Sequence, residues 1–286
     1  MSIIIPRTVP ARYHQEFVER LSRIAPYHGK ALIFAADHKL EQGLTLDPTH
    51  FFAIAEQSKL VLASHLGLIS RYLAGETTGA IIKLSAKTPT QKLRNAEPNS
   101  IQITSIEEVV TFNKNNHNKV LGVGITIYLG SEKEEIMLAN AARAITQAHE
   151  HGFPVVLWSY IRGSAIAPEK ASSYLPLTAS VGASLGADFV KLQLPQGDLS
   201  HKVQLLEETK VAAGNVQLLF AGGEPLNAHE LLRTTNYLVH QLGWAGGAIG
   251  RNIFGHPTNY ACLLAQTVTK LMASEIDLDD ALAQIP

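Results

Sequence analysis

Short apolar, β-prone runs alternate with longer amphipathic or alanine-rich segments along most of this 286-residue chain. Such alternation is typical of βα units arranged around a parallel sheet. Eight runs are predicted to be strands: residues 31–36, 66–70 (the weakest run), 80–84, 120–127, 154–159, 188–193, 216–221 and 244–249. Eight is the number of strands in a closed (β/α)8 TIM barrel, which is the α/β fold that we predict.

Helices are predicted between these strands, at residues 48–63, 106–115, 132–151, 169–185, 202–212, 227–242 and 258–273. Pro48 and Pro168 stand where a first helical turn tolerates proline, because that position does not use its amide hydrogen. Residues 1–30 are interpreted as an N-terminal cap and residues 86–105 as an extended loop. No repeat or linker divides the chain, so we expect residues 1–286 to form one barrel domain.

Composition excludes several classes of protein. With 24 basic and 25 acidic side chains and no long basic stretch, nucleic acid is not an expected partner. No segment has the ~18 consecutive apolar residues of a membrane span, and the start of the chain lacks the basic region of a secretion signal. The single cysteine, Cys262, excludes an intramolecular disulfide. We therefore expect a cytoplasmic protein with a small-molecule partner.

In a (β/α)8 barrel the active site is built at the carboxyl ends of the strands. Lys191 draws attention there, because it lies within the apolar run ADFVKLQL at residues 187–194. A period of two places Phe189, Lys191 and Gln193 on one strand face, which points into the barrel if Val190 faces the helices. A buried amine whose pKa falls is a nucleophile for a carbonyl, which indicates Schiff-base chemistry. The alternative is a lysine at a strand end whose ammonium reaches water.

Lys83 is a rival to Lys191, because it lies in a similar apolar setting in IIKL at residues 81–84. The pattern leaves two roles open for it. Its charge would lower the pKa of Lys191 by like-charge repulsion, or it would form a structural ion pair.

Tyr160 and Trp158 share a face of the strand at residues 154–159, by the same period of two. A phenol at a strand end can transfer protons, although most buried tyrosines pack and make one hydrogen bond. Arg162 follows on the loop, where it binds a substrate oxygen or pairs with an acidic neighbour.

Asp37 and His38 follow the strand at residues 31–36. This carboxylate can bind substrate hydroxyls or accept a proton, and the imidazole can assist it. Asp37 is alternatively a turn or cap residue, or half of a metal-ligand pair. No second cluster supports a metal site, since His149 and His151 are expected on an exposed helix face without the i, i+4 spacing of a zinc motif.

Two glycine-containing loops follow the last two predicted strands, where barrels often bind phosphate. Gly222 and Gly223 form one loop, and Gly250 and Arg251 the other. The alternatives are tight turns and an ordinary surface arginine.

Taken together, these residues lie in five stretches: FAADH at 34–38, PVVLWSYIRG at 154–163, LGADFVK at 185–191, FAGGEP at 220–225 and GAIGRNIF at 247–254. The chain thereby resembles the archaeal-type class I fructose-1,6-bisphosphate aldolases, also found in bacteria, of the DeoC/LacD-like group of Schiff-base aldolases. The resemblance spans roughly residues 31–273.

This resemblance implies a lyase of glycolysis and gluconeogenesis that needs neither a cofactor nor a metal. Lys191 would form the Schiff base, Tyr160 would be the general acid/base, and Asp37 would bind the hydroxyls of the reacting carbons. The implied substrate contacts are His38, Trp158, Gly222, Gly223, Gly250 and Arg251. A sugar phosphate is the implied partner, and a homo-oligomer, often a decamer, is the implied assembly.

Three departures from the family pattern leave the substrate open. Lys39 replaces the common glycine after Asp-His, Ala221 replaces a serine, and Ile161 replaces a frequent proline. Lys39 would close over the pocket or contact an anion. The leading hypothesis is cleavage of fructose 1,6-bisphosphate. The alternatives are a related aldolase, transaldolase or thiolase acting on another phosphorylated ketose, and a barrel that binds sugar phosphates without turnover.

Overall fold

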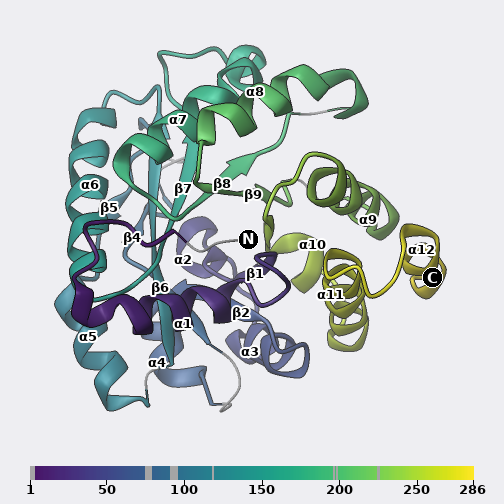
Figure 1. Ribbon diagram of the computed structural model, residues 1–286, viewed down its shortest axis with the longest axis horizontal. Helices are drawn as coiled ribbons and strands as arrows, with labels where there is room; N and C mark the ends of the chain where they lie inside the picture. Colours follow the sequence, from purple (N-terminus) through teal and green to yellow (C-terminus); the bar gives the residue numbers. More distant parts are fainter. Residues whose placement is uncertain are drawn as a thin grey trace.

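The computed structural model describes residues 4–74, 79–90, 96–117, 119–195, 197, 199–223 and 226–286. Within these ranges, eight parallel strands close a barrel in the order β1-β10-β9-β8-β7-β6-β3-β2 (Figure 1). Their bounds are β1 Ala31–Ala35, β2 Val61–His65, β3 Ala80–Lys83, β6 Val120–Leu129, β7 Val155–Ile161, β8 Phe189–Gln193, β9 Gln217–Ala221 and β10 Gly246–Ile249. The predicted (β/α)8 barrel is confirmed.

Helices surround this barrel in Figure 1. The α-helices are α1 His14–Ile24, α2 His38–Gln42, α3 Pro48–Gln57, α4 Leu66–Tyr72, α5 Ile106–Asn115, α6 Glu134–Glu150, α7 Leu175–Leu185, α8 Val203–Ala213, α9 Ala228–Asn236, α10 Arg251–Phe254, α11 Thr258–Met272 and α12 Leu278–Gln284. Shorter elements are η1 Ala11–Tyr13, η3 Pro168–Tyr174, η4 Leu199–Lys202 and η5 Tyr237–Gln241, with an antiparallel pair of β4 Ser85–Ala86 and β5 Ile101–Gln102.

The strands are buried on both faces, as a parallel barrel requires. On β8, Phe189 packs with the side chains inside the barrel, whereas Val190 and Leu192 pack in the layer between strands and helices. Lys191 therefore points into the barrel, as the period of two predicts.

Helix starts follow the local sequence. Asp47 accepts a hydrogen bond from the Thr49 N–H and is followed by Pro48 at the first position of α3. Ser105 and Glu108 form a capping box at the start of α5. These side chains satisfy amide groups that have no partner within the helix.

The predicted strand at residues 66–70 is wrong, because these residues form α4 and the second barrel strand is β2. The predicted helix at 48–63 was too long: α3 ends at Gln57, and Lys59 has a left-handed backbone with φ of 54°. Alanine and leucine in residues 60–63 suit either structure, and barrel pairing decides for the strand. The predicted helix at 169–185 is divided into η3 and α7, with Pro176 in the first turn of α7.

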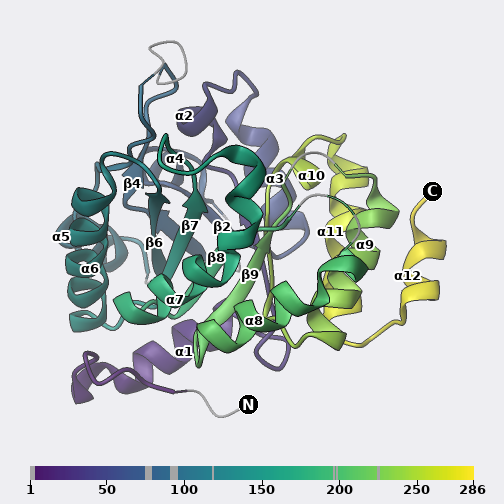
Figure 2. The same ribbon diagram turned by 90° about the horizontal axis from the view of Figure 1, so that it is seen from above.

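Helix α1 lies at one end of the barrel and α2 at the other (Figure 2). Arg20 of α1 donates to the carbonyl oxygens of His151 and Gly152, at 3.0 and 2.6 Å. His149, expected on an exposed face, is instead buried, and its Nε2 lies 3.1 Å from Asp188 Oδ2. No helix among the described residues is long and apolar enough to span a membrane.

Candidate active site

Lys191 lies on β8 inside the barrel and is only 7% exposed. It pairs in register with Trp158 of β7, and its Nζ lies 5.6 Å from the centre of the Trp158 ring. Burial lowers the pKa of Lys191 to about 8, opposed by the charge of Asp37 and assisted by the charges of Lys83 and Arg162. A substantial amine population at neutral pH follows, which is the form that attacks a carbonyl.

Lys83, the last residue of β3, is 1% exposed and lies over the same indole ring, with its Nζ 4.1 Å from the ring centre. Its ammonium donates to Asp37 Oδ2 at 3.1 Å and to Thr126 Oγ1 at 2.7 Å. Both roles left open by the sequence are therefore combined, since Lys83 forms a buried ion pair and also lowers the pKa of Lys191.

Asp37 follows β1 and precedes α2. Burial alone would raise its pKa, but the charge of Lys83 and the neighbouring His38 and Lys191 hold it below its ordinary value. Asp37 is therefore ionised at neutral pH, and it stabilises any cation formed on Lys191.

Gly124 of β6 makes room for this arrangement. A Cβ at this position would lie 2.3 Å from Cζ3 of Trp158 and 3.2 Å from Cδ of Lys83. Any larger residue would displace the indole ring that lies beside both lysines.

Tyr160 lies two residues after Trp158, and its ring stacks on Tyr128 at a centroid distance of 6.2 Å. The Arg162 guanidinium lies 5.0 Å from the centre of the Tyr160 ring. Burial raises the pKa of Tyr160 although Arg162 opposes this effect, so the side chain is a neutral phenol at ordinary pH. A neutral phenol can donate a proton, and a nearby guanidinium stabilises the phenolate left behind.

Three further titratable groups surround Asp37. Burial lowers the pKa of His38 and of His65 to about 4, so both imidazoles are neutral. Burial raises the pKa of Glu41 to about 7, and Glu41 Oε1 lies 3.9 Å from His65 Nε2. This carboxyl group changes charge in the physiological pH range.

Most of these groups line a small polar cavity of about 70 Å³. It is lined by Asp37, His38, Glu41, Gln42, Lys83, Lys87, Thr126, Tyr128, Trp158, Tyr160, Arg162 and Lys191. The sequence-based prediction missed Glu41, Gln42, Thr126 and Tyr128 as lining residues. Glu41 is four residues after Asp37, and Thr126 and Tyr128 alternate along β6, so periodicity would have indicated these three.

The predicted phosphate loops lie side by side after β9 and β10, just outside this cavity. Arg251 Nη2 donates to the Gly223 carbonyl oxygen, and Asn252 Nδ2 donates to the Gly222 carbonyl oxygen, both at 2.7 Å. A Cβ on Gly250 would lie 2.5 Å from Cε1 of His38, so this loop adjoins the cavity through His38. Glu224 and Pro225 of the FAGGEP stretch, and residues 91–95 of the predicted loop, lie outside the described residues.

Two departures from the family pattern have clear structural positions. Lys39 Nζ donates to the carbonyl oxygens of Leu44 and Leu46, at 3.2 and 2.6 Å, and the side chain does not line the cavity. Ala221 is the last residue of β9, directly before the paired glycines. Among the described residues, no group of three or more His, Cys, Asp or Glu side chains is placed to hold a metal ion.

Comparison with known proteins agrees with this geometry. A fructose-bisphosphate aldolase/6-deoxy-5-ketofructose 1-phosphate synthase of Methanocaldococcus jannaschii is 34% identical, over 97% of this chain and 93% of its own length. The structure of a fructose-bisphosphate aldolase from Slackia heliotrinireducens is 34% identical with a TM-score of 0.92, covering 99% of this chain and 93% of that one.

An archaeal fructose-1,6-bisphosphate aldolase, whose catalytic lysine is covalently bound to the carbinolamine intermediate, superimposes with a TM-score of 0.77 and 28% identity. That match covers 90% of this chain and 99% of the other. The model of the DeoC/LacD family aldolases matches residues 32–256, which include all of the barrel strands except Ala31 of β1. This chain therefore belongs to the DeoC/LacD family of aldolases.

Proposed function

We propose that this chain is a class I, Schiff-base aldolase that cleaves fructose 1,6-bisphosphate to dihydroxyacetone phosphate and glyceraldehyde 3-phosphate, and catalyses the reverse condensation. The observation that carries the proposal is Lys191, a buried lysine with a pKa lowered to about 8. The names of the relatives support the substrate.

In the proposed reaction, the Lys191 amine attacks the C2 carbonyl carbon to give a carbinolamine, and loss of water gives an iminium ion. The C3–C4 bonding pair then moves toward the iminium nitrogen as the C4 hydroxyl loses its proton, which releases glyceraldehyde 3-phosphate and leaves an enamine. Protonation at C3 and hydrolysis of the imine release dihydroxyacetone phosphate. The iminium is the electron sink for the cleavage.

Tyr160 enters this sequence as an acid, because burial keeps it protonated. It donates a proton to the hydroxyl group of the carbinolamine, which leaves as water, and Arg162 stabilises the resulting phenolate. The phenolate then accepts the proton of the C4 hydroxyl. Asp37, held ionised by Lys83, accepts hydrogen bonds from substrate hydroxyls and stabilises the iminium.

We assign the phosphate groups to the loops at Gly222, Gly223, Gly250 and Arg251, with His38 and Trp158 as further contacts. The hydrogen bonds from Arg251 and Asn252 tie the two loops together and support this assignment. We further propose that residues 1–286 form one barrel domain with residues 1–30 as its cap, in a cytoplasmic homo-oligomer such as the decamer that the family resemblance implies.

Borohydride reduction with fructose 1,6-bisphosphate tests the chemistry. A substrate-derived mass should appear on the Lys191 peptide, and Lys191→Met should lose both the adduct and the cleavage activity. Lys270→Met, an exposed lysine on α11, serves as the matched control and should retain both. Absence of any adduct in the unaltered protein would overturn the proposal.

A second substrate is favoured by the name of the Methanocaldococcus relative, which includes 6-deoxy-5-ketofructose 1-phosphate synthesis. The same lysine and acid would serve that reaction, because it also joins an enamine to a carbonyl carbon. Comparison of kcat/KM for the two ketose phosphates decides between them. If kcat/KM for 6-deoxy-5-ketofructose 1-phosphate is well above that for fructose 1,6-bisphosphate, the assigned substrate changes and the Schiff-base mechanism stays in place.

A further inference from the structure

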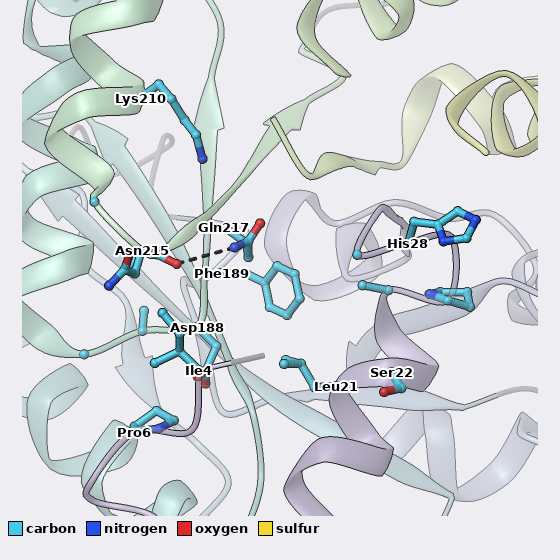
Figure 3. A pocket seen from close by; sticks show the side chains of 17 residues that line it. Ile4, Pro6, Leu21, Ser22, His28, Asp188, Phe189, Lys210, Asn215 and Gln217 are labelled. Atoms are coloured by element: carbon cyan, nitrogen blue, oxygen red, sulfur yellow. Dashed lines mark hydrogen bonds between the residues drawn. The ribbon is translucent and has the colours of Figure 1, made fainter. Parts of the chain in front are cut away.

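A second, larger cavity, shown in Figure 3, lies at the α1 end of the barrel, whereas the cavity at Lys191 includes residues of α2 at the other end (Figure 2). It has a volume of about 740 Å³ and lies between α1 with its following turn and the residues that lead into β8 and β9. This volume is within the range of about 300–1,000 Å³ that is usual for small-molecule sites. None of the proposed catalytic residues lines it.

Much of the cavity wall is apolar. Phe189, at the start of β8, points toward the cavity in Figure 3 but is only 1% exposed, whereas Leu21 of α1 is half-buried and borders the cavity. Val216, Ile4 and Pro6 extend this apolar surface. A ligand with an aromatic or aliphatic body would bury its apolar surface here.

One cation faces this apolar wall. Lys210 of α8 extends toward the cavity in Figure 3 and is half-buried. No hydrogen bond or ion pair to its ammonium is found within the described part of the chain, and burial lowers the pKa of Lys210. Burial also lowers the pKa of the neighbouring Lys30, and the charge of Lys210 adds to this effect. Burial disfavours the ammonium of Lys210, and a bound anion would offset that effect.

The acidic side chain in the wall does not supply that anion. Asp188 Oδ2 lies 3.1 Å from His149 Nε2 and accepts a hydrogen bond from the Val155 N–H at 2.7 Å. This carboxylate therefore already has partners on α6 and β7. Neutral polar groups complete the wall, among them Ser22 and Gln217.

We propose that this cavity binds a small organic anion with an apolar body, whose carboxylate or sulfonate pairs with Lys210 while its body lies on Leu21 and Pro6. The ligand contacts both α1 and the barrel strands, so it stabilises the docking of the N-terminal segment onto the barrel. Binding to the folded state alone raises the melting temperature with ligand concentration.

Fluorescence of 8-anilinonaphthalene-1-sulfonate, an apolar aromatic sulfonate, tests this proposal on the full chain. We expect saturable binding of one molecule per chain and a melting temperature that rises with probe concentration. Lys210→Ala should weaken binding at least about tenfold, because it removes a charge-assisted hydrogen bond. Lys114→Ala, on the exposed side of α5, should leave binding unchanged.

Ser22→Trp gives an independent test, because its indole would fill the cavity from α1 without altering any charge. This variant should lose binding while it keeps the native circular dichroism spectrum and full aldolase activity. Unaltered probe affinity in both Lys210→Ala and Ser22→Trp would overturn the proposal. Complete displacement of the probe by fructose 1,6-bisphosphate would also overturn it, because the probe would then occupy the substrate site.

Discussion

Replacement of Lys83 by methionine should move the pH dependence of the enzyme to higher pH. Methionine keeps most of the volume of the side chain but removes the charge that repels the Lys191 ammonium. It also frees Asp37, which lies 3.1 Å from Lys83 Nζ, to pair with Lys191. Both changes favour protonated Lys191, which cannot attack a carbonyl.

The size of this effect follows from the geometry around Trp158. Lys83 Nζ lies 4.1 Å and Lys191 Nζ lies 5.6 Å from the centre of the Trp158 ring. The distance between the two nitrogen atoms therefore cannot exceed the sum of these distances, about 9.7 Å. With an effective dielectric constant of about 20, their repulsion is then at least about 1.7 kcal/mol, which corresponds to more than one pH unit. The pKa of Lys191 should therefore rise from about 8 to above about 9 in Lys83→Met.

The assay is kcat/KM for fructose 1,6-bisphosphate cleavage between pH 6 and pH 10, with borohydride trapping at each pH. At pH 7 the amine fraction of Lys191, and with it kcat/KM, should fall at least about tenfold, whereas at pH 10 most activity should return. Thr126→Val is the control, because it removes the hydrogen bond at Lys83 but leaves the charge. If Lys83→Met loses activity equally at every pH, and kcat/KM still rises with pH near pH 8, the electrostatic argument is refuted.

Three further changes test the site. Tyr160→Phe keeps the stacking on Tyr128 but removes the acid, so cleavage should fall by about 10²–10⁴-fold while some covalent adduct remains detectable by mass spectrometry. Gly124→Ala places a Cβ 2.3 Å from the Trp158 ring, and urea unfolding should show a loss of about 1–3 kcal/mol. Glu41→Gln removes a carboxyl group with a pKa of about 7, so any inflection of kcat/KM near pH 7 should disappear while the limb near pH 8 remains.

The sequence predicts the parts of this site that depend on local periodicity. The inward positions of Lys191 and Trp158 follow from the period of two along their strands, and the proposed phosphate loops are identified only by their places after the last two strands. The contact between Lys83 and Asp37 joins residues 46 positions apart, and no local pattern predicts it. The second barrel strand, β2, was predicted at the wrong residues for a related reason. Its residues suit either a helix or a strand, and pairing with β1 and β3 decides for the strand.

The proposed reaction needs Lys191 in opposite charge states at different steps, and the surrounding residues suit this sequence. Attack on the carbonyl requires the neutral amine, which burial and the charge of Lys83 favour. The iminium that follows is a cation, and Asp37 favours it because this carboxylate is kept ionised by the same Lys83. Lys83 therefore favours the amine directly and the iminium through Asp37. For this reason its removal should impair both steps at neutral pH, whereas loss of Thr126 alone should impair neither by much.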